Sequence, residues 1–413
     1  MKKNLSTNVN NLIEDRKTIN DRPSWIFYVA LLMGFATSAF LFYRQITMST
    51  KGYASDLIYY VLESEKEGSS RYVTNLFRLL TQIFGSKVPI AVYMGIVIVG
   101  IICVTRAIIQ EFLRIDGIRA DRYFVDIFSA SIVFTGSIYI PIVQPYFYKV
   151  GWASFAWHSP TQQSMIFFAL VSMLFLTKIL ATYMYEIKFR YWVPMMIGAV
   201  LSTWAKPSFL LTFTPAIIVV FVTELILQRG DGKSGERLRR LFAVGFAYVP
   251  AGMLFIYFIF WYKTSQKGNE IFLGLERFLD TNPSLIRVAV SAVLVLALPI
   301  TVFFFNANKI KDLRYNLAFW MLMFGILEWI FIYEVGDHSN DGNFDWGKQW
   351  GIFYTYVLSF AVILENYFDK DFLCDKKGLR KAYFTVASVI YVSMLITRVY
   401  YYRQLMRGAN FWM

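Results

Sequence analysis

A single acidic residue opens a polar segment that could do chemistry. Asp56 stands in Gly52-Tyr-Ala-Ser-Asp-Leu, shortly after the first long apolar stretch. A carboxylate in such a position can act as a general base, or it can hold a divalent metal against a phosphate leaving group. Ser-Asp before an apolar stretch is also a common signal for a helix N-terminus. The sequence leaves both roles open for Asp56.

Three basic residues are candidates for contact with a phosphate. Lys206 lies in Ser202-Thr-Trp-Ala-Lys-Pro-Ser, between two apolar stretches that are short for membrane spans, and we expect a broken helical hairpin there. A lysine at membrane depth indicates a functional site by default, with snorkelling to the interface as the alternative. Arg71 and Arg78 belong to an amphipathic segment, Arg71 to Phe84, that is too short to span a bilayer. We expect this segment to lie in the headgroup region, where its arginines can meet lipid phosphates.

Two aromatic-rich segments could hold a sugar or a diphosphate. The first ends in Trp157-His-Ser-Pro-Thr, which offers an imidazole and two hydroxyls beside aromatic faces. The alternative is an ordinary helix start, with Ser159 or Thr161 as the cap and Pro160 in the first turn. The second segment, residues 334–348, combines acids, amides and tryptophan, and is either a carbohydrate lid or a solvated, turn-rich loop. The candidates for sugar or acceptor contact are Trp157, His158, Thr161, Asp337, His338, Asn343 and Trp346.

Metal and nucleotide sites find little support in these segments. The spacing of Asp337, Asn340, Asp341 and Asp345 matches no calcium-loop pattern. Two cysteines in the chain give no disulfide framework and no thiolate metal site. There is no P-loop, so no nucleotide-binding domain is fused to the chain. We predict no metal ligands, and the one cofactor that phosphate chemistry would admit is a divalent cation, Mg²⁺ or Mn²⁺.

The elements that must position these residues are membrane helices. Of the 413 residues, 57% are hydrophobic and 17% are charged. The apolar residues fall in blocks of about 18 to 22, the length at which a helix crosses roughly 30 Å of hydrocarbon. This pattern excludes an ordinary soluble enzyme, a disordered chain and a secreted disulfide scaffold. Basic cytoplasmic loops explain the net charge of +13, so we expect a lipid bilayer and no nucleic acid as partner.

We predict an all-α polytopic integral membrane protein with about eleven transmembrane helices and one interfacial amphipathic helix. Residues 1–24 form a cytoplasmic N-terminal segment, residues 25–400 a single transmembrane domain, and residues 401–413 a C-terminal tail. The predicted spans are Trp25–Phe42, Val88–Ile109, Phe124–Val143, Met165–Tyr185, Trp192–Trp204, Phe209–Leu227, Leu241–Trp261, Val288–Phe305, Leu317–Tyr333, Gly351–Leu364 and Ala382–Val399.

Basic residues predict how the chain is oriented in the membrane. With a cytoplasmic N-terminus, the basic clusters of the spans' connecting loops fall on the inner side. The candidate residues then lie on the outer side, in a first loop that carries the interfacial helix and in three others. These extracytoplasmic loops are 44–87, 145–164, 263–287 and 334–348. The expected location is a cell membrane, plasma or inner, that is rich in anionic lipid.

This arrangement resembles the C-type glycosyltransferases (GT-C), polytopic membrane enzymes that use polyprenyl-phosphate-linked sugar donors. The shared features are the number of spans, an acid early in the first outer loop and an interfacial helix after it. In addition, Leu201-Ser-Thr-Trp-Ala-Lys-Pro-Ser-Phe-Leu-Leu is similar to the Lys-Pro segment of many bacterial members. The resemblance implies that Asp56 is the catalytic residue and that Lys206 lies near the donor phosphate. Paired acids are common in the family's first loop, whereas Leu57 follows Asp56 here, which favours a base over a metal ligand.

Three functions remain open from the sequence. The first is transfer of a sugar from a polyprenyl-phosphate carrier to a glycan, lipid or protein acceptor in bacterial polysaccharide or cell-envelope synthesis. The second is a Wzy-type polymerase that joins lipid-linked repeat units, which the moderate size of the outer loops disfavours. The third is a non-enzymatic lipid or glycan flippase, for which the spans carry few charged residues.

Overall fold

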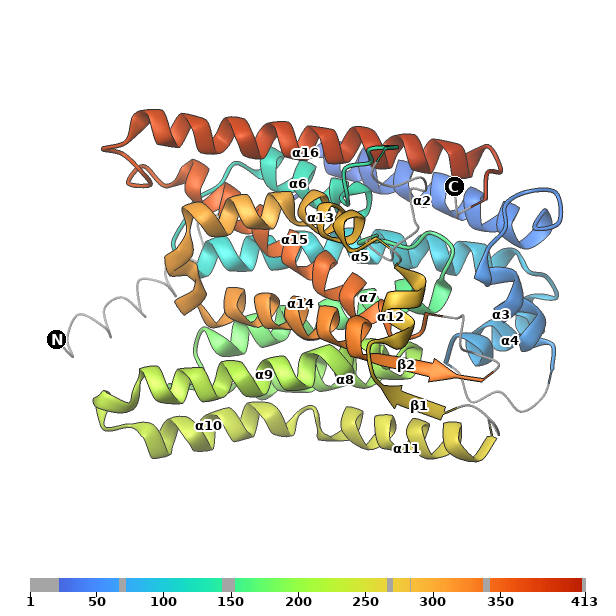
Figure 1. Ribbon diagram of the computed structural model, residues 1–413, viewed down its shortest axis with the longest axis horizontal. Helices are drawn as coiled ribbons and strands as arrows, with labels where there is room; N and C mark the ends of the chain where they lie inside the picture. Colours follow the sequence, from blue (N-terminus) through green and yellow to red (C-terminus); the bar gives the residue numbers. More distant parts are fainter. Residues whose placement is uncertain are drawn as a thin grey trace.

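The protein is a bundle of long helices with a pair of short strands. The computed structural model describes residues 22–66, 72–142, 153–265, 270–282, 284–336 and 342–410. Figure 1 shows most of the helices lying along one common direction. The helices and strands are α2 (Trp25–Thr47), α3 (Asp56–Ser64), α4 (Tyr72–Phe84), α5 (Val88–Ile115), α6 (Arg122–Ser131), η2 (Ile132–Phe134), α7 (Pro160–Leu180), α8 (Phe189–Ala205), α9 (Ser208–Leu227), η3 (Arg229–Asp231), α10 (Ser234–Phe246), α11 (Val249–Ser265), β1 (Glu270–Leu273), α12 (Glu276–Thr281), α13 (Leu285–Phe305), η4 (Ala307–Lys311), α14 (Leu313–Phe331), β2 (Ile332–Val335), α15 (Asp345–Phe368) and α16 (Lys377–Met406).

Length and apolar composition identify the helices that can cross a membrane. Within the described residues, seven qualify singly: α2, α5, α7, α9, α13, α15 and α16. Helices α10 and α11 qualify as a pair that is bent by 50° at a short break. These helices confirm an α-helical, multi-pass membrane protein, because each is long enough to cross roughly 30 Å of hydrocarbon. The predicted count of eleven spans is not confirmed.

The predicted span Phe124–Val143 does not form one helix. Helix α6 has 10 residues and is followed by the single turn of η2. At 1.5 Å per residue, α6 covers about 15 Å, half of a bilayer core. Its Asp126 is buried, lies 2.5 Å from Arg106 of α5 and accepts a hydrogen bond from the backbone N–H of Ser24. These polar contacts fix α6 against the bundle.

Helix α15 is the centre of the bundle. Of its most apolar window, 83% is buried inside the protein, compared with 22% for α2 and for α16. Helix α14 crosses α15 at close range, because glycines stand at the contact. A Cβ on Gly351 would lie 2.7 Å from Cα of Leu322, and one on Gly325 would lie 2.7 Å from the backbone of Lys348. Small residues allow this approach between helix backbones.

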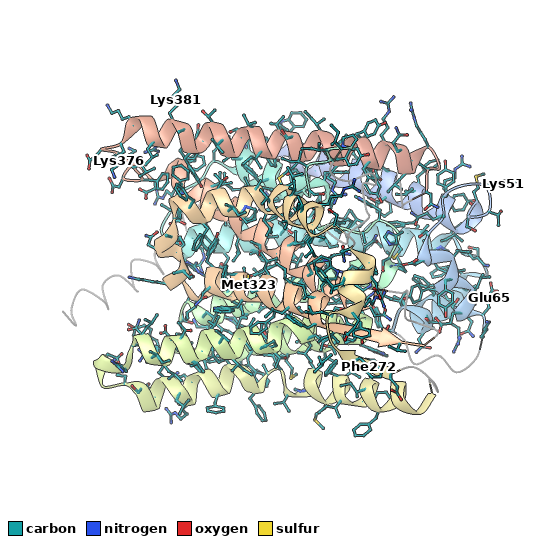
Figure 2. The ribbon with its side chains drawn as sticks, in the orientation of Figure 1. Lys51, Glu65, Phe272, Met323, Lys376 and Lys381 are labelled. Atoms are coloured by element: carbon teal, nitrogen blue, oxygen red, sulfur yellow. The ribbon has the colours of Figure 1, made fainter. Side chains whose placement is uncertain are left out.

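The two ends of the bundle carry different elements. Figure 1 shows α3, α4 and the strands towards one end, at the right of the view. In Figure 2, Lys51 and Glu65 lie at that end, whereas Lys376 and Lys381 lie at the opposite one. The end of α16 returns to the first of these regions, because the N–H of Tyr53 donates to the carbonyl of Gly408.

The strands β1 and β2 are an addition to the predicted all-α fold. They pair antiparallel, with Glu270 opposite Val335 and Leu273 opposite Ile332. The amphipathic segment forms α4 as expected, with Val73 and Phe77 buried against the bundle. On its other side, Ile83 and Phe84 are exposed.

Candidate functional site

Asp56 occupies the first turn of α3, and a neighbour does the capping. The Ser55 side chain accepts a hydrogen bond from the N–H of Leu57, so the cap role that the sequence left open belongs to Ser55. The Ser55 hydroxyl also lies 2.9 Å from both Gln45 Oε1 and the carbonyl of His158. The Asp56 side chain remains 43% exposed. A carboxylate in this position is favoured by the helix dipole.

His158 lies directly behind Asp56. Its Nε2 is 3.9 Å from Oδ2 of Asp56, and its side chain is 3% exposed. Burial lowers the pKa of His158 to about 3, and the positive charge of Lys206 acts in the same direction. The imidazole is therefore neutral at pH 7, and the separation exceeds hydrogen-bond length. Asp56 thus faces a neutral ring and is partly exposed to solvent.

Lys206 approaches the same place from the break between α8 and α9. It follows the end of α8 in an extended conformation (φ −163°, ψ 127°), as expected for the residue before Pro207. The helices are therefore broken at Lys206 and Pro207, as predicted, but α9 by itself is long and apolar enough to cross a membrane. Its Nζ lies 3.8 Å from the centre of the Trp346 ring. The Trp346 ring is in turn 6.1 Å from that of His158.

Four of the predicted residues therefore meet, and we call them the Asp56 cluster: Asp56, His158, Lys206 and Trp346. They come from α3, the segment before α7, the α8–α9 break and the first turn of α15. An exposed carboxylate can accept a proton, and an ammonium group on an aromatic face can attract a phosphate. The cluster has the parts for a proton transfer beside an anionic leaving group.

Buried ionisable side chains that the sequence analysis did not assign to the site lie near the cluster. Lys348 is fully buried with its Nζ 3.2 Å from the Trp329 ring centre. The carboxylate of Asp345 interacts electrostatically with Lys348, Arg277 and Lys206. Glu328 is buried, and neither of its carboxylate oxygens has a hydrogen-bond partner in the described part of the chain. Glu328 falls within the predicted span Leu317–Tyr333, where a carboxyl group is rare, whereas Arg277 falls in the predicted loop 263–287, where an arginine is ordinary.

Helix α15 starts earlier than expected, and this explains why Asp345 and Lys348 were not assigned to the site from the sequence. The predicted loop 334–348 was to end before a span at Gly351, but α15 begins at Asp345. Asp345 and Lys348 are consequently on one helix face, three residues apart.

Two other candidates near His158 in the chain are buried inside the protein. Trp157 is buried, and its ring centre lies 4.5 Å from that of Tyr402. Thr161 is buried in the first turn of α7, and its hydroxyl is 3.4 Å from that of Ser159. The helix start that the sequence offered as the alternative is therefore present, with Ser159 at the N-cap position and Pro160 as the first residue, but the Ser159 side chain makes no capping hydrogen bond.

Two further candidates form hydrogen bonds with other groups of the protein. The guanidinium of Arg78 donates to the carbonyls of Ser64 and Lys66, and so closes the end of α3. The amide of Asn343 donates to Glu334 Oε2 over 2.7 Å. Their predicted contacts with phosphate and sugar stay predictions. Arg71, Asp337 and His338 lie outside the described residues.

The described residues contain no group of three or more His, Cys, Asp or Glu side chains placed to hold a metal ion. The candidate divalent cation therefore has no ready set of protein ligands within that part of the chain.

Comparison with known proteins adds no family. No protein-family model matches the chain, and no curated protein sequence matches it.

Proposed function

We propose that this protein is a membrane glycosyltransferase of the GT-C kind, which moves a sugar from a polyprenyl-phosphate-linked donor to a hydroxyl group of a glycan, lipid or protein acceptor. The observation that carries the proposal is the meeting of Asp56, His158 and Lys206 from three separate segments. It supplies a carboxylate that can take a proton and an ammonium group that can meet a phosphate. The early acid and the Lys-Pro segment that suggested the family are among these residues.

Each residue has a defined part in the proposed step. The Asp56 carboxylate takes the proton of the acceptor hydroxyl, while the acceptor oxygen forms a bond to the anomeric carbon of the donor sugar. The bond between that carbon and the phosphate oxygen breaks, and the electron pair leaves with the phosphate. Lys206 stabilises the growing negative charge. His158 is held neutral by burial and packs beside Asp56, and it does not compete with Asp56 for the proton.

The membrane orientation belongs to the same proposal. Residues 1–24 are cytoplasmic, and the Asp56 cluster faces the extracytoplasmic side of a cell membrane. Helix α4 lies in the headgroup region with Ile83 and Phe84 towards lipid. The shorter helices α8 and α14 lie within the bilayer among the long ones, which brings the number of membrane helices towards the predicted eleven.

Mass spectrometry of lipid-linked glycans tests the function in cells that lack the gene or carry Asp56→Asn. We expect the same precursor, short of one sugar, in both strains, because the amide cannot accept the proton. Glu65→Gln is the matched control: Glu65 is an acid of the same loop, is 51% exposed and pairs with Lys87. This control strain should keep the wild-type glycans.

Other profiles would replace the proposal. Complete repeat units that accumulate without polymerisation indicate the polymerase, and substrate retained on the cytoplasmic side indicates a flippase. A folded Asp56→Asn variant that transfers sugar at the wild-type rate removes Asp56 as the base.

A further inference from the structure

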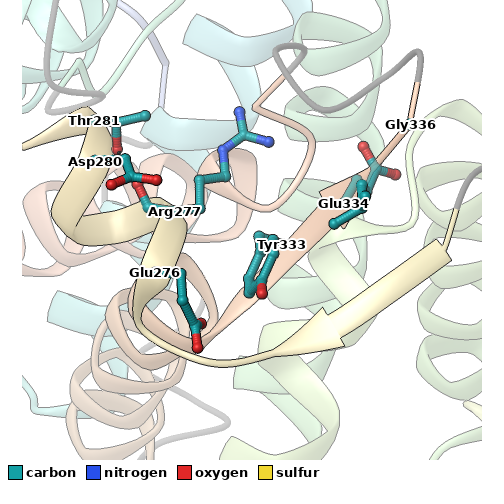
Figure 3. Close-up of a pocket in the computed structure, with 8 residues that line it drawn as sticks. Glu276, Arg277, Asp280, Thr281, Tyr333, Glu334 and Gly336 are labelled. Atoms are coloured by element: carbon teal, nitrogen blue, oxygen red, sulfur yellow. Dashed lines mark hydrogen bonds between the residues drawn. The ribbon is translucent and has the colours of Figure 1, made fainter.

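A second polar site lies beside the Asp56 cluster. It is a cavity of about 310 Å³ between α12 and β2, shown in Figure 3. Its volume is at the lower end of the range for small-molecule pockets. We call it the α12 cavity; the lining residues that carry charge or an aromatic ring are Glu276, Arg277, Asp280, Tyr333 and Glu334.

Packing behind the α12 cavity holds both of its walls. Phe278 of α12 sets its ring edge-on to Trp329 of α14, with 4.9 Å between the ring centres. The opposite wall is β2, which is paired with β1. Glu334 of β2 is 5% exposed and accepts a hydrogen bond from Asn343. The cavity is thus formed by anchored elements, as a binding site requires.

The lining suits a ligand that is rich in hydroxyl groups. Figure 3 shows the Tyr333 ring between the side chains of Glu276 and Glu334, with Arg277 above it. Carboxylates accept hydrogen bonds from hydroxyl groups, and a guanidinium donates to their oxygens. Burial and the neighbouring Glu276 carboxylate, which accepts a hydrogen bond from the phenol, raise the pKa of Tyr333, so its hydroxyl keeps its proton at neutral pH. A saccharide offers donors, acceptors and an apolar C–H face for the ring.

The net charge of the lining restricts which class of saccharide the cavity can bind. The lining has three carboxylates and one guanidinium, which gives it an excess of negative charge. An acidic sugar would be repelled. The carboxylates are also too dispersed for a cation, because the described residues hold no group of three metal-ligating side chains. The lining therefore fits a neutral or amine-bearing sugar.

Electrostatic interactions and a short segment of the chain link the α12 cavity to the Asp56 cluster. Arg277 and Lys206 both interact electrostatically with the carboxylate of Asp345. Asp345 precedes Trp346, the residue on which Lys206 rests. Asn343, in the same short segment, binds Glu334 of the cavity. A ligand in the cavity would therefore lie next to the proposed reaction centre.

We infer that the α12 cavity binds the acceptor of the transfer, and that this acceptor is a neutral or amine-bearing saccharide. The role of the bound saccharide as acceptor rests on the proposed function. Saccharide binding itself can be measured without any transfer. It assigns recognition to Glu276, Arg277 and Tyr333 and leaves proton transfer to Asp56.

Binding of defined oligosaccharides to the full chain in lipid nanodiscs tests the inference. The probes are fluorescent oligosaccharides of three classes: neutral, amine-bearing and uronic acid-containing. We expect wild-type protein to bind members of the first two classes only. Glu276→Gln and Tyr333→Leu should each weaken that binding about tenfold, because each removes one polar or stacking contact. Both side chains line an open cavity, and a wild-type elution volume in size exclusion verifies folding.

The controls separate this inference from the proposed function. Asp56→Asn should bind saccharide as the wild type does, within about twofold. Saccharide binding together with normal transfer by Asp56→Asn would contradict the proposed base and leave the cavity's role intact. Three results overturn the inference: no neutral or amine-bearing probe binds, uronic acids bind best, or the cavity variants bind like the wild type.

Discussion

The ammonium group of Lys206 lies 3.8 Å above the ring of Trp346, although the two residues belong to segments far apart in the chain. A cation on an aromatic face gains about 0.5–2 kcal/mol, more where water is excluded. Trp346 is 7% exposed, so the contact is shielded from solvent. The ring places the lysine where its positive charge also acts on His158.

Replacing Lys206 tests whether its charge serves the reaction. Lys206→Met keeps the length of the side chain and removes the ammonium group, so we expect sugar transfer to fall by about 100-fold in kcat/KM. Lys206→Arg keeps a cation that can stack on Trp346 and should retain activity within about tenfold. Transfer by purified protein measures both. Lys51→Met, an exposed lysine of the first loop, is the control, and equal activity of Lys206→Met and this control would contradict the role.

The burial of His158 predicts a dependence of stability on pH. The pKa of His158 is about 3 in the folded protein and about 6.5 in an unfolded chain. Below pH 6.5 the unfolded chain takes up a proton that the folded protein refuses, so stability falls as the pH drops from 6.5 towards 3. The loss is about 1.4 kcal/mol for each pH unit in that interval. Among the described residues, Asp56 and Lys206 are charged groups that act on the imidazole.

Unfolding temperatures in detergent, followed by tryptophan fluorescence between pH 4 and pH 8, test this dependence. His158→Gln should lose less stability than the wild type below pH 6.5, because its side chain does not titrate. His338→Gln removes the only other histidine and should keep the wild-type slope. Parallel profiles for the wild type and His158→Gln would show that His158 is not held neutral.

The crossing of α14 and α15 predicts a sensitive glycine. A Cβ at Gly351 would lie 2.7 Å from Cα of Leu322 and 3.0 Å from the carbonyl oxygen of Met321. Backbone atoms cannot move aside singly, so Gly351→Ala must separate the helices and should cost about 1–3 kcal/mol. Gly378→Ala is the control, since no atom lies within 4 Å of its added Cβ. Thermal unfolding of the two variants compares them, and an equal midpoint would contradict the tight crossing.

Part of the candidate site could be predicted from the sequence. Asp56, His158, Lys206 and Trp346 were each identifiable: Asp56 as an acid after the first apolar stretch, Lys206 as a charge at membrane depth, and His158 and Trp346 as members of segments rich in aromatic and polar residues. The break at Lys206 was predictable too, since Pro207 prevents a helical conformation at the residue before it. Arg277 and Tyr333 were not identifiable, because arginines and tyrosines in loops at the end of a span are ordinary.

By itself, the sequence determined that this chain forms membrane helices, where most of them lie and that α4 is amphipathic. These are properties of consecutive residues: an apolar block of sufficient length must be helical in hydrocarbon, because its backbone groups have no other partners there. Only the tertiary structure decided that Phe124–Val143 breaks after α6, that α15 starts at Asp345, and that the α12 cavity adjoins the Asp56 cluster. Each of these depends on contacts between distant segments, such as Asp126 with Arg106 or Lys206 with Trp346. Such contacts arise from the packing of whole helices, and no local pattern of residues specifies which loops the packing brings together.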